Sequence, residues 1–180
     1  MPESGQVTRK HALFLIGFMG SGKSSVGQAL SRRLGWRFID LDARIEAAEG
    51  RTIETIFRNS GEAAFRKAET EELDRLLREL DAQSEVIVAL GGGAWVQPDN
   101  FGLLKSCDVP AVFLDAPVEV LWQRCQGEAG LRPLARNADE FRRIYELRRN
   151  RYLDAEARID TSEKDVETVT AEVISWLGLD

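Results

Sequence analysis

The chain has 180 residues and carries 30 acidic against 24 basic side chains, which gives a formal net charge of −6 at pH 7. This acidic balance argues against a protein that coats nucleic acid, and no apolar run approaches the roughly 20 residues of a membrane span. The two cysteines, Cys107 and Cys125, show no C-x-x-C or metal-ligand spacing, which suits a reducing compartment. We therefore expect one domain over residues 1–180, cytoplasmic and monomeric, with neither nucleic acid nor membrane as a partner.

Short apolar runs alternate with longer segments of helical character along the whole chain. The expected strands are 12–16, 37–39, 86–90, 111–114 and 157–159. The expected helices are 23–34, 52–58 with Thr52 as N-cap, 62–80, 118–125, 139–153 and 166–177. Unbroken apolar runs such as 86–90 are typical of parallel strands that helices cover on both faces. The pattern predicts a three-layer α/β/α fold around a five-stranded parallel sheet.

The first expected strand leads directly into residues 17–24, GFMGSGKS, which match the phosphate-loop pattern G-x-x-x-x-G-K-[ST]. In this pattern backbone N–H groups surround the phosphates of a nucleotide, Lys23 reaches the β- and γ-phosphates, and the Ser24 hydroxyl sits on Mg²⁺. The alternative is a glycine-rich turn with a surface lysine. The position of the segment between an expected strand and an expected helix favours nucleotide binding.

Two carboxylates, Asp40 and Asp42, follow the second expected strand, where ligands gather in open α/β sheets. Side chains two residues apart in extended chain share a face. We therefore expect both in one crevice, one serving a metal ion and the other the group that accepts phosphate. The alternative is that they cap the helix beginning near residue 43 and interact with its dipole. The two roles are compatible.

Arg66 and Glu69 lie three residues apart on an expected helix, so their side chains share one face. A guanidinium held by a neighbouring carboxylate is pre-organised to bind a substrate carboxylate with two hydrogen bonds. An ordinary exposed ion pair is an equally good interpretation, and Glu62 is a rival partner for Arg66.

Three consecutive glycines, Gly91, Gly92 and Gly93, follow the third expected strand. Their bare backbone favours close approach of a small polar ligand, with a plain turn as the alternative. Further along, residues 126–137 are poor in large apolar side chains and contain Gly, Ala and Arg132. This composition favours a mobile lid that closes over ATP and excludes water, with an ordinary surface loop as the alternative.

Taken together, these segments resemble the shikimate kinase family over nearly the whole chain, in order and in interval. The resemblance rests on residues 17–24, 40–42, 61–62, 65–66, 69, 90–93 and 131–134, and on Arg149. It implies a P-loop kinase that uses ATP and Mg²⁺ to phosphorylate the 3-hydroxyl of shikimate in aromatic amino acid biosynthesis. After Arg149 the chain reads Asn150-Arg151-Tyr152-Leu153, where the family generally has Pro-Leu-Tyr.

For the acceptor, the resemblance implies that Asp42 acts near the accepting oxygen and that Arg66 and Arg149 bind the carboxylate. The backbone of Gly91, Gly92 and Gly93 would hold the ring, and the pocket wall would be completed by Phe57, Phe65 and Glu69. Two alternatives stay open: a kinase for a related small polyol acid, and a nucleotide-binding relative without turnover. The joint presence of Asp42, Arg66 and the three glycines favours shikimate.

For the nucleotide, the resemblance implies that Ser24 and Asp40 form the magnesium side of the site. The phosphates would lie in a cradle formed by Gly20, Ser21, Gly22, Lys23, Ser24 and Ser25. Arg124 looks like the arginine that stacks on adenine. Arg132 looks like the lid arginine that reaches the transferring phosphoryl group, so the catalytic set would be Asp42, Lys23 and Arg132.

Overall fold

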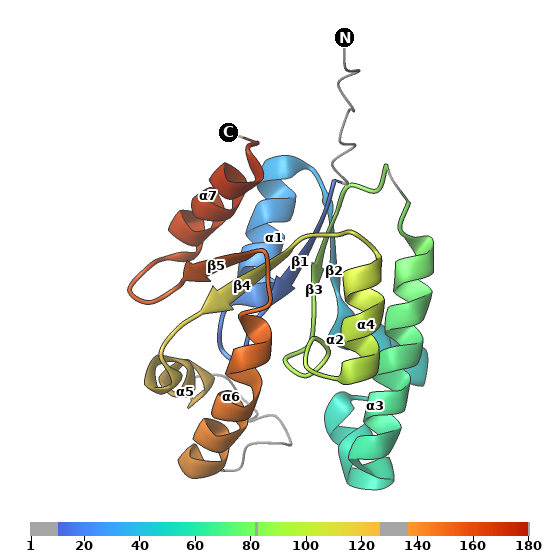
Figure 1. Cartoon of the computed structure of the whole chain (residues 1–180). Helices are drawn as coiled ribbons and strands as arrows, with labels where there is room; N and C mark the ends of the chain where they lie inside the picture. Colours follow the sequence, from blue (N-terminus) through green and yellow to red (C-terminus); the bar gives the residue numbers. More distant parts are fainter. Residues whose placement is uncertain (1–10, 82, 127–136, 180) are drawn as a thin grey trace.

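A computed structural model describes residues 11–81, 83–126 and 137–179. These residues form a five-stranded, wholly parallel sheet with the order β2-β3-β1-β4-β5 (Figure 1). Its strands are β1 (Ala12–Ile16), β2 (Arg37–Asp40), β3 (Val86–Ala89), β4 (Ala111–Asp115) and β5 (Ala157–Asp160). The predicted parallel sheet is therefore confirmed. Because β1 lies at its centre, the loop that follows this strand opens at the middle of the carboxyl edge, where α/β proteins bind ligands.

Helices cover both faces of the sheet (Figure 1). They are α1 (Lys23–Leu34), α2 (Leu41–Glu49), α3 (Ile53–Glu79), α4 (Pro98–Ser106), α5 (Val118–Gln126), α6 (Ala138–Tyr152) and α7 (Val166–Leu177). Among the residues described, none of the helices is both long enough and apolar enough to cross a membrane.

The alternation of side chains along β1 divides the core into two parts. Leu13 and Leu15 point to one face, where they pack with residues of α1 and α7. Phe14 and Ile16 point to the other face, where they pack with residues of the remaining helices. All five residues of β1 are buried, because successive side chains of a strand point to opposite faces and both faces are covered. This is the predicted three-layer arrangement.

The two helices expected at 52–58 and 62–80 form one continuous element, α3, with a break at Gly61. Gly61 has φ 83° and ψ 174°, a backbone conformation that is open to glycine and strained for other residues. Thr52 caps the element as predicted, since its side chain accepts a hydrogen bond from the backbone N–H of Thr55 at 3.2 Å.

Helix α2 was considered only as the alternative for Asp40 and Asp42, and helix α4 was not expected. Helix α2 begins at Leu41, directly after β2, so Asp42 lies in a helical first turn and the expected extended geometry is wrong there. Asp40 starts this helix, because its Oδ1 accepts from the N–H groups of Asp42 at 3.0 Å and Ala43 at 3.4 Å. Helix α4 begins with Pro98, a residue favoured at the first helical position, but its interior contains Gly102, which is a poor helix former.

Candidate active site

The loop between β1 and α1 is built as an anion site. Gly22 is the N-cap of α1 and makes no side-chain capping hydrogen bond, and the first turn of the helix carries no acidic residue. The N–H groups of that turn, which include those of Ser24 and Ser25, are therefore not capped by the side chain of the N-cap residue. Unpaired N–H groups together with the helix dipole favour a phosphate at this end of a helix.

Lys23 folds back into this loop. Its side chain is buried, and Nζ donates to the carbonyl oxygens of Gly17 at 2.9 Å and Phe18 at 3.0 Å, and to Ser21 Oγ at 3.4 Å. A lysine is seldom buried unless its charge is satisfied, and here the loop itself supplies the acceptors. The ammonium group is thereby held where the loop would enclose a phosphate.

Ser24 and Asp40 meet beside the loop. Ser24 Oγ donates to Asp40 Oδ2 at 2.8 Å, while the other oxygen of Asp40 caps α2. Within residues 11–81, 83–126 and 137–179 there is no cluster of three or more His, Cys, Asp or Glu side chains of the kind that encloses a metal ion. Mg²⁺ commonly takes only one or two protein oxygens and completes its shell with phosphate and water. The adjacent hydroxyl and carboxylate fit that kind of site.

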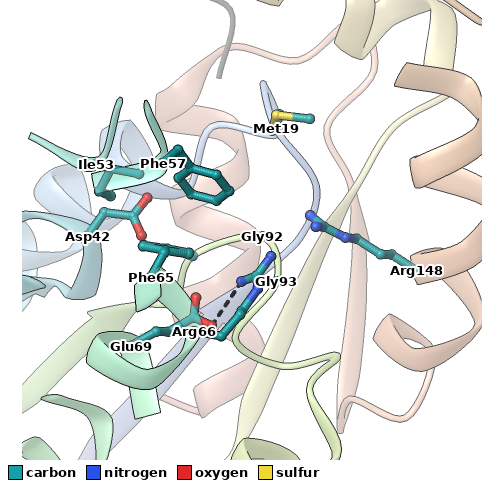
Figure 2. A pocket seen from close by; sticks show the side chains of 11 residues that line it. Met19, Asp42, Ile53, Phe57, Phe65, Arg66, Glu69, Gly92, Gly93 and Arg148 are labelled. Atoms are coloured by element: carbon teal, nitrogen blue, oxygen red, sulfur yellow. Dashed lines mark hydrogen bonds and ion pairs between the residues drawn. The ribbon is translucent and has the colours of Figure 1, made fainter. Parts of the chain in front are cut away.

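A pocket of about 390 Å³, part of it open to solvent, lies beside the phosphate loop (Figure 2). One wall comes from α2 and α3, the base from the glycine turn after β3, and the opposite wall from Met19 and α6. The fold thus gathers most of the predicted acceptor residues: the pocket is lined by Met19, Asp42, Ile53, Phe57, Phe65, Arg66, Glu69, Gly91, Gly92, Gly93 and Arg148.

Arg66 is held from two sides. Nη1 donates to Glu69 Oε2 at 2.9 Å, and Nη2 donates to Glu62 Oε1 at 3.3 Å, so both partners considered from the sequence are engaged at once. The guanidinium also packs 5.0 Å from the centre of the Phe65 ring. A side chain at Gly93 would overlap the guanidinium, so the bare backbone there is what lets Arg66 reach its place.

Arg148, rather than Arg149, faces the pocket (Figure 2). Arg149 is engaged elsewhere: Nη2 donates to Asp115 Oδ2 and Nε donates to the hydroxyl of Tyr145, each at 3.1 Å. The placement predicted for Arg149 was therefore wrong by one residue. On a helix that step rotates a side chain by about 100°, which is enough to turn it out of the pocket.

A sequence signal for Arg148 was present. The buried aromatic residues of α6 are Phe141, Tyr145 and Tyr152. Arg148 lies three residues after Tyr145 and four before Tyr152, which places it on the same inward stripe of the helix. Arg149 lies four residues after Tyr145 and three before Tyr152, so this signal favours Arg148 only slightly, and the packing of α6 decides between the two arginines.

The family model described as shikimate kinase matches residues 19–178. The chain belongs to the shikimate kinase family. The shikimate kinase of Persephonella marina is 36% identical over 162 residues, which cover 90% of this chain and 96% of the relative. That of Geobacter metallireducens is 43% identical over 168 residues, which cover 92% and 90%. A solved shikimate kinase from Acinetobacter baumannii in complex with shikimate is 32% identical, covers 92% of each chain and has a TM-score of 0.84. The protein is thus a kinase.

In this shikimate kinase family member, Glu69 is a fully buried carboxylate. Burial raises the pKa of Glu69, the charge and hydrogen bond of Arg66 oppose that rise, and the charge of Asp42 adds to it. Gly91 lies between the two acids, since a Cβ built there would lie 2.6 Å from Asp42 Oδ1 and 3.5 Å from Glu69 Oε1. The acidic side of the pocket is therefore crowded, and the backbone of the glycine turn separates its two charges.

Arg124 lies against the loop between β1 and α1. Nη1 donates to Thr161 Oγ1 at 3.0 Å and to the carbonyl oxygen of Gly20 at 3.3 Å, and Nη2 donates to the Thr161 carbonyl oxygen at 2.8 Å. These contacts fix the guanidinium against the phosphate loop. Arg132, like the rest of the expected lid from 127 to 136, lies outside the described residues.

Proposed function

We propose that the protein transfers the γ-phosphoryl group of ATP to the 3-hydroxyl of shikimate at the pocket of Figure 2. The observation that carries the proposal is the charge pattern of that pocket. Arg66 is paired with Glu62 and Glu69, whereas Arg148 makes no hydrogen bond or ion pair with any described residue. A guanidinium group that faces a pocket and has no hydrogen-bonded partner among the described residues favours an anionic ligand, and a carboxylate matches its planar shape.

In this proposal the shikimate carboxylate lies between the guanidinium groups of Arg148 and Arg66. Arg66 is already held by two carboxylates, so little of its conformational freedom is lost on binding. The ring would rest against the Gly91–Gly93 backbone and the aromatic wall. That wall is compact, because Phe57 and Phe65 stack with their ring centres 4.8 Å apart. The acceptor is then held by its charged end and by its flat face.

Asp42 takes the reacting end of the acceptor. It lies in the first turn of α2, which Asp40 caps beside Ser24, so the carboxylate is positioned next to the phosphate loop. Phosphoryl transfer through a loose transition state requires mainly alignment of donor and acceptor and late acceptance of the hydroxyl proton. Asp42 is suited to orient the hydroxyl and then to accept its proton.

The nucleotide phosphates would occupy the loop around Lys23, which already turns its ammonium group inward. Ser24 and Asp40 would hold Mg²⁺, which when bound neutralises the charge of the phosphates. Arg124, fixed against the loop, is the candidate contact for adenine, and Arg132 is proposed from the sequence to approach the transferring phosphoryl group.

The proposal is tested by coupled measurement of ADP release with ATP, Mg²⁺ and a panel of acceptors that includes shikimate and gluconate. Turnover with shikimate and none with gluconate is expected. Asp42→Asn should lower kcat by about 10²- to 10⁴-fold while ATP still binds, because only proton acceptance and orientation are lost. Near-normal turnover of this variant would remove Asp42 from the mechanism, and preference for another acid would overturn the acceptor.

A further inference from the structure

Two hydrogen bonds join the end of α6 to the glycine turn that forms the base of the pocket. The hydroxyl of Tyr152 donates to the carbonyl oxygen of Gly92, and Nε1 of Trp95 donates to the carbonyl oxygen of Arg151 at 3.0 Å. The Tyr152 and Trp95 side chains are buried, with 0% and 1% of their surface exposed. The two segments are therefore joined in both directions, and both donors are on buried side chains.

Gly92 contacts two residues on the inward stripe of α6. A Cβ built at Gly92 would lie 3.4 Å from Arg148 Nη1 and 3.7 Å from the hydroxyl of Tyr152. Arg148 and Tyr152 are four residues apart, so they lie one turn apart on the same face of the helix. The hydroxyl that holds the turn and the guanidinium that faces the acceptor thus share one backbone neighbour.

The Tyr152 ring is fixed from the sheet side. It packs against Phe113 of β4 with the ring centres 5.2 Å apart and the planes 32° apart. Because the ring cannot follow a displaced turn without disturbing this contact, its hydroxyl acts as a fixed donor for the Gly92 carbonyl. Without it, that buried carbonyl would have to rotate or shift to find another donor.

We infer that Tyr152 is a positioning residue for the acceptor. Its hydroxyl holds the Gly91–Gly93 backbone at one distance from the Arg148 guanidinium, and so determines the width of the space that receives the acid. This inference rests on the proposed function. The turn and Arg148 would contact parts of the acceptor that do not react, so a change in their spacing weakens the substrate and the transition state alike.

The test is Tyr152→Phe, which keeps the ring packed on Phe113 and removes only the hydroxyl. The KM for shikimate should rise roughly tenfold, in line with the sensitivity of binding sites to small displacements, with kcat within about twofold of the unchanged chain. The KM for ATP should not change, because the phosphate loop has no part in the hydrogen bond. Calorimetric titration with shikimate should show the same loss of affinity without turnover.

The matched control is Tyr145→Phe, seven residues earlier on the same helix. Its hydroxyl donates to the carbonyl oxygen of Ala116 at 3.2 Å and does not line the pocket. This variant loses the same group from the same helix, so the KM for shikimate should stay within about twofold of that of the unchanged chain.

Two outcomes would overturn the inference: an unchanged KM for shikimate in Tyr152→Phe, whether or not kcat falls, or an equal rise in the Michaelis constants for shikimate and ATP. Near-UV circular dichroism at 10 °C shows whether the variant is folded. Calorimetric titration with shikimate at that temperature then measures its affinity even if the variant unfolds under the conditions of the kinetic assay. Failure of the proposed function is seen separately, because the unchanged chain would then show no turnover with shikimate.

Discussion

The two walls of the pocket are held in different ways. The wall of α2 and α3 is held by ion pairs between side chains, whereas the wall of α6 is joined to the base of the pocket by hydrogen bonds that buried aromatic side chains donate to backbone carbonyl groups. The first wall neutralises its own arginine, Arg66, and the second leaves Arg148 without an ion pair among the described residues. Arginine therefore provides a fixed guanidinium group on the α3 wall and a positive charge without an ion-pair partner among the described residues on the α6 wall.

The ion pairs of the first wall extend well beyond the pocket. Arg44 of α2 donates from Nε to Glu72 Oε1 at 2.6 Å and, with both terminal nitrogens, to Glu79 at 2.8 Å each. These bonds join the helix that carries Asp42 to the helix that carries Arg66. Bidentate pairing of this kind specifies geometry as well as adding energy.

The largest effect is expected when the charge of Arg148 is removed from the α6 wall. Arg148→Gln should lower kcat/KM for shikimate about a hundredfold, since a charge-assisted hydrogen bond to the acceptor contributes about 3 kcal/mol. Its neighbour Arg149→Gln is the matched control and should change kcat/KM less than about threefold, because Arg149 pairs with Asp115 outside the pocket. Steady-state kinetics of both variants measure the difference. A larger loss of kcat/KM in Arg149→Gln than in Arg148→Gln would mean that Arg149, the arginine predicted from the sequence, binds the acceptor.

Changing the paired arginine tests alignment without removing charge. Arg66→Lys should raise the KM for shikimate about tenfold, since the planar fork is lost while the positive charge stays. The KM for ATP should be unaffected. An equal effect of Arg148→Lys and Arg66→Lys, measured in the same assay, would contradict the division of roles between the two walls.

The ion pairs of Arg44 with Glu72 and Glu79 should contribute to the free energy of unfolding. Arg44→Gln should lower the free energy of unfolding by about 1–2 kcal/mol, because buried Glu72 and exposed Glu79 lose the arginine that bridges them. Urea denaturation followed by circular dichroism gives the value. As a control, Arg78→Gln removes an exposed i,i+4 pair with Asp74 and should change stability by no more than about 0.5 kcal/mol.

A smaller effect is expected from pH. Burial raises the pKa of Glu69 in the folded chain above its usual 4.5. The folded state therefore binds the proton of the Glu69 carboxyl group more tightly than the unfolded state does. Lowering the pH through the range from the raised pKa to 4.5 should therefore stabilise the wild-type chain relative to Glu69→Gln. Denaturant unfolding of both proteins across this range tests the sign. A difference that moves the other way would mean that the pairing with Arg66 outweighs burial.

The parts of the site that lie on contiguous residues were predictable. The phosphate loop needs glycines, Lys23 and Ser24 at set intervals, and a helix period alone places Arg66 beside Glu69. The three inner strands, β1, β3 and β4, were found because parallel strands buried on both faces must be apolar throughout. Helix α2 was considered only as an alternative, because its start depends on a capping hydrogen bond that the side chain of Asp40 accepts, and this bond competes with the extended conformation.

The amino-acid sequence by itself determined the chemistry that this protein can offer: a phosphate cradle, a carboxylate near the acceptor and arginines for an acid. The tertiary structure determines which arginine of α6 faces the pocket. Both Arg148 and Arg149 lie on α6, and only the packing of Phe141, Tyr145 and Tyr152 against the core determines which one faces the pocket. It also brought Tyr152 to Gly92 across 60 residues of chain. Contacts of that range depend on how the layers pack, because no local pattern records the distance between two segments.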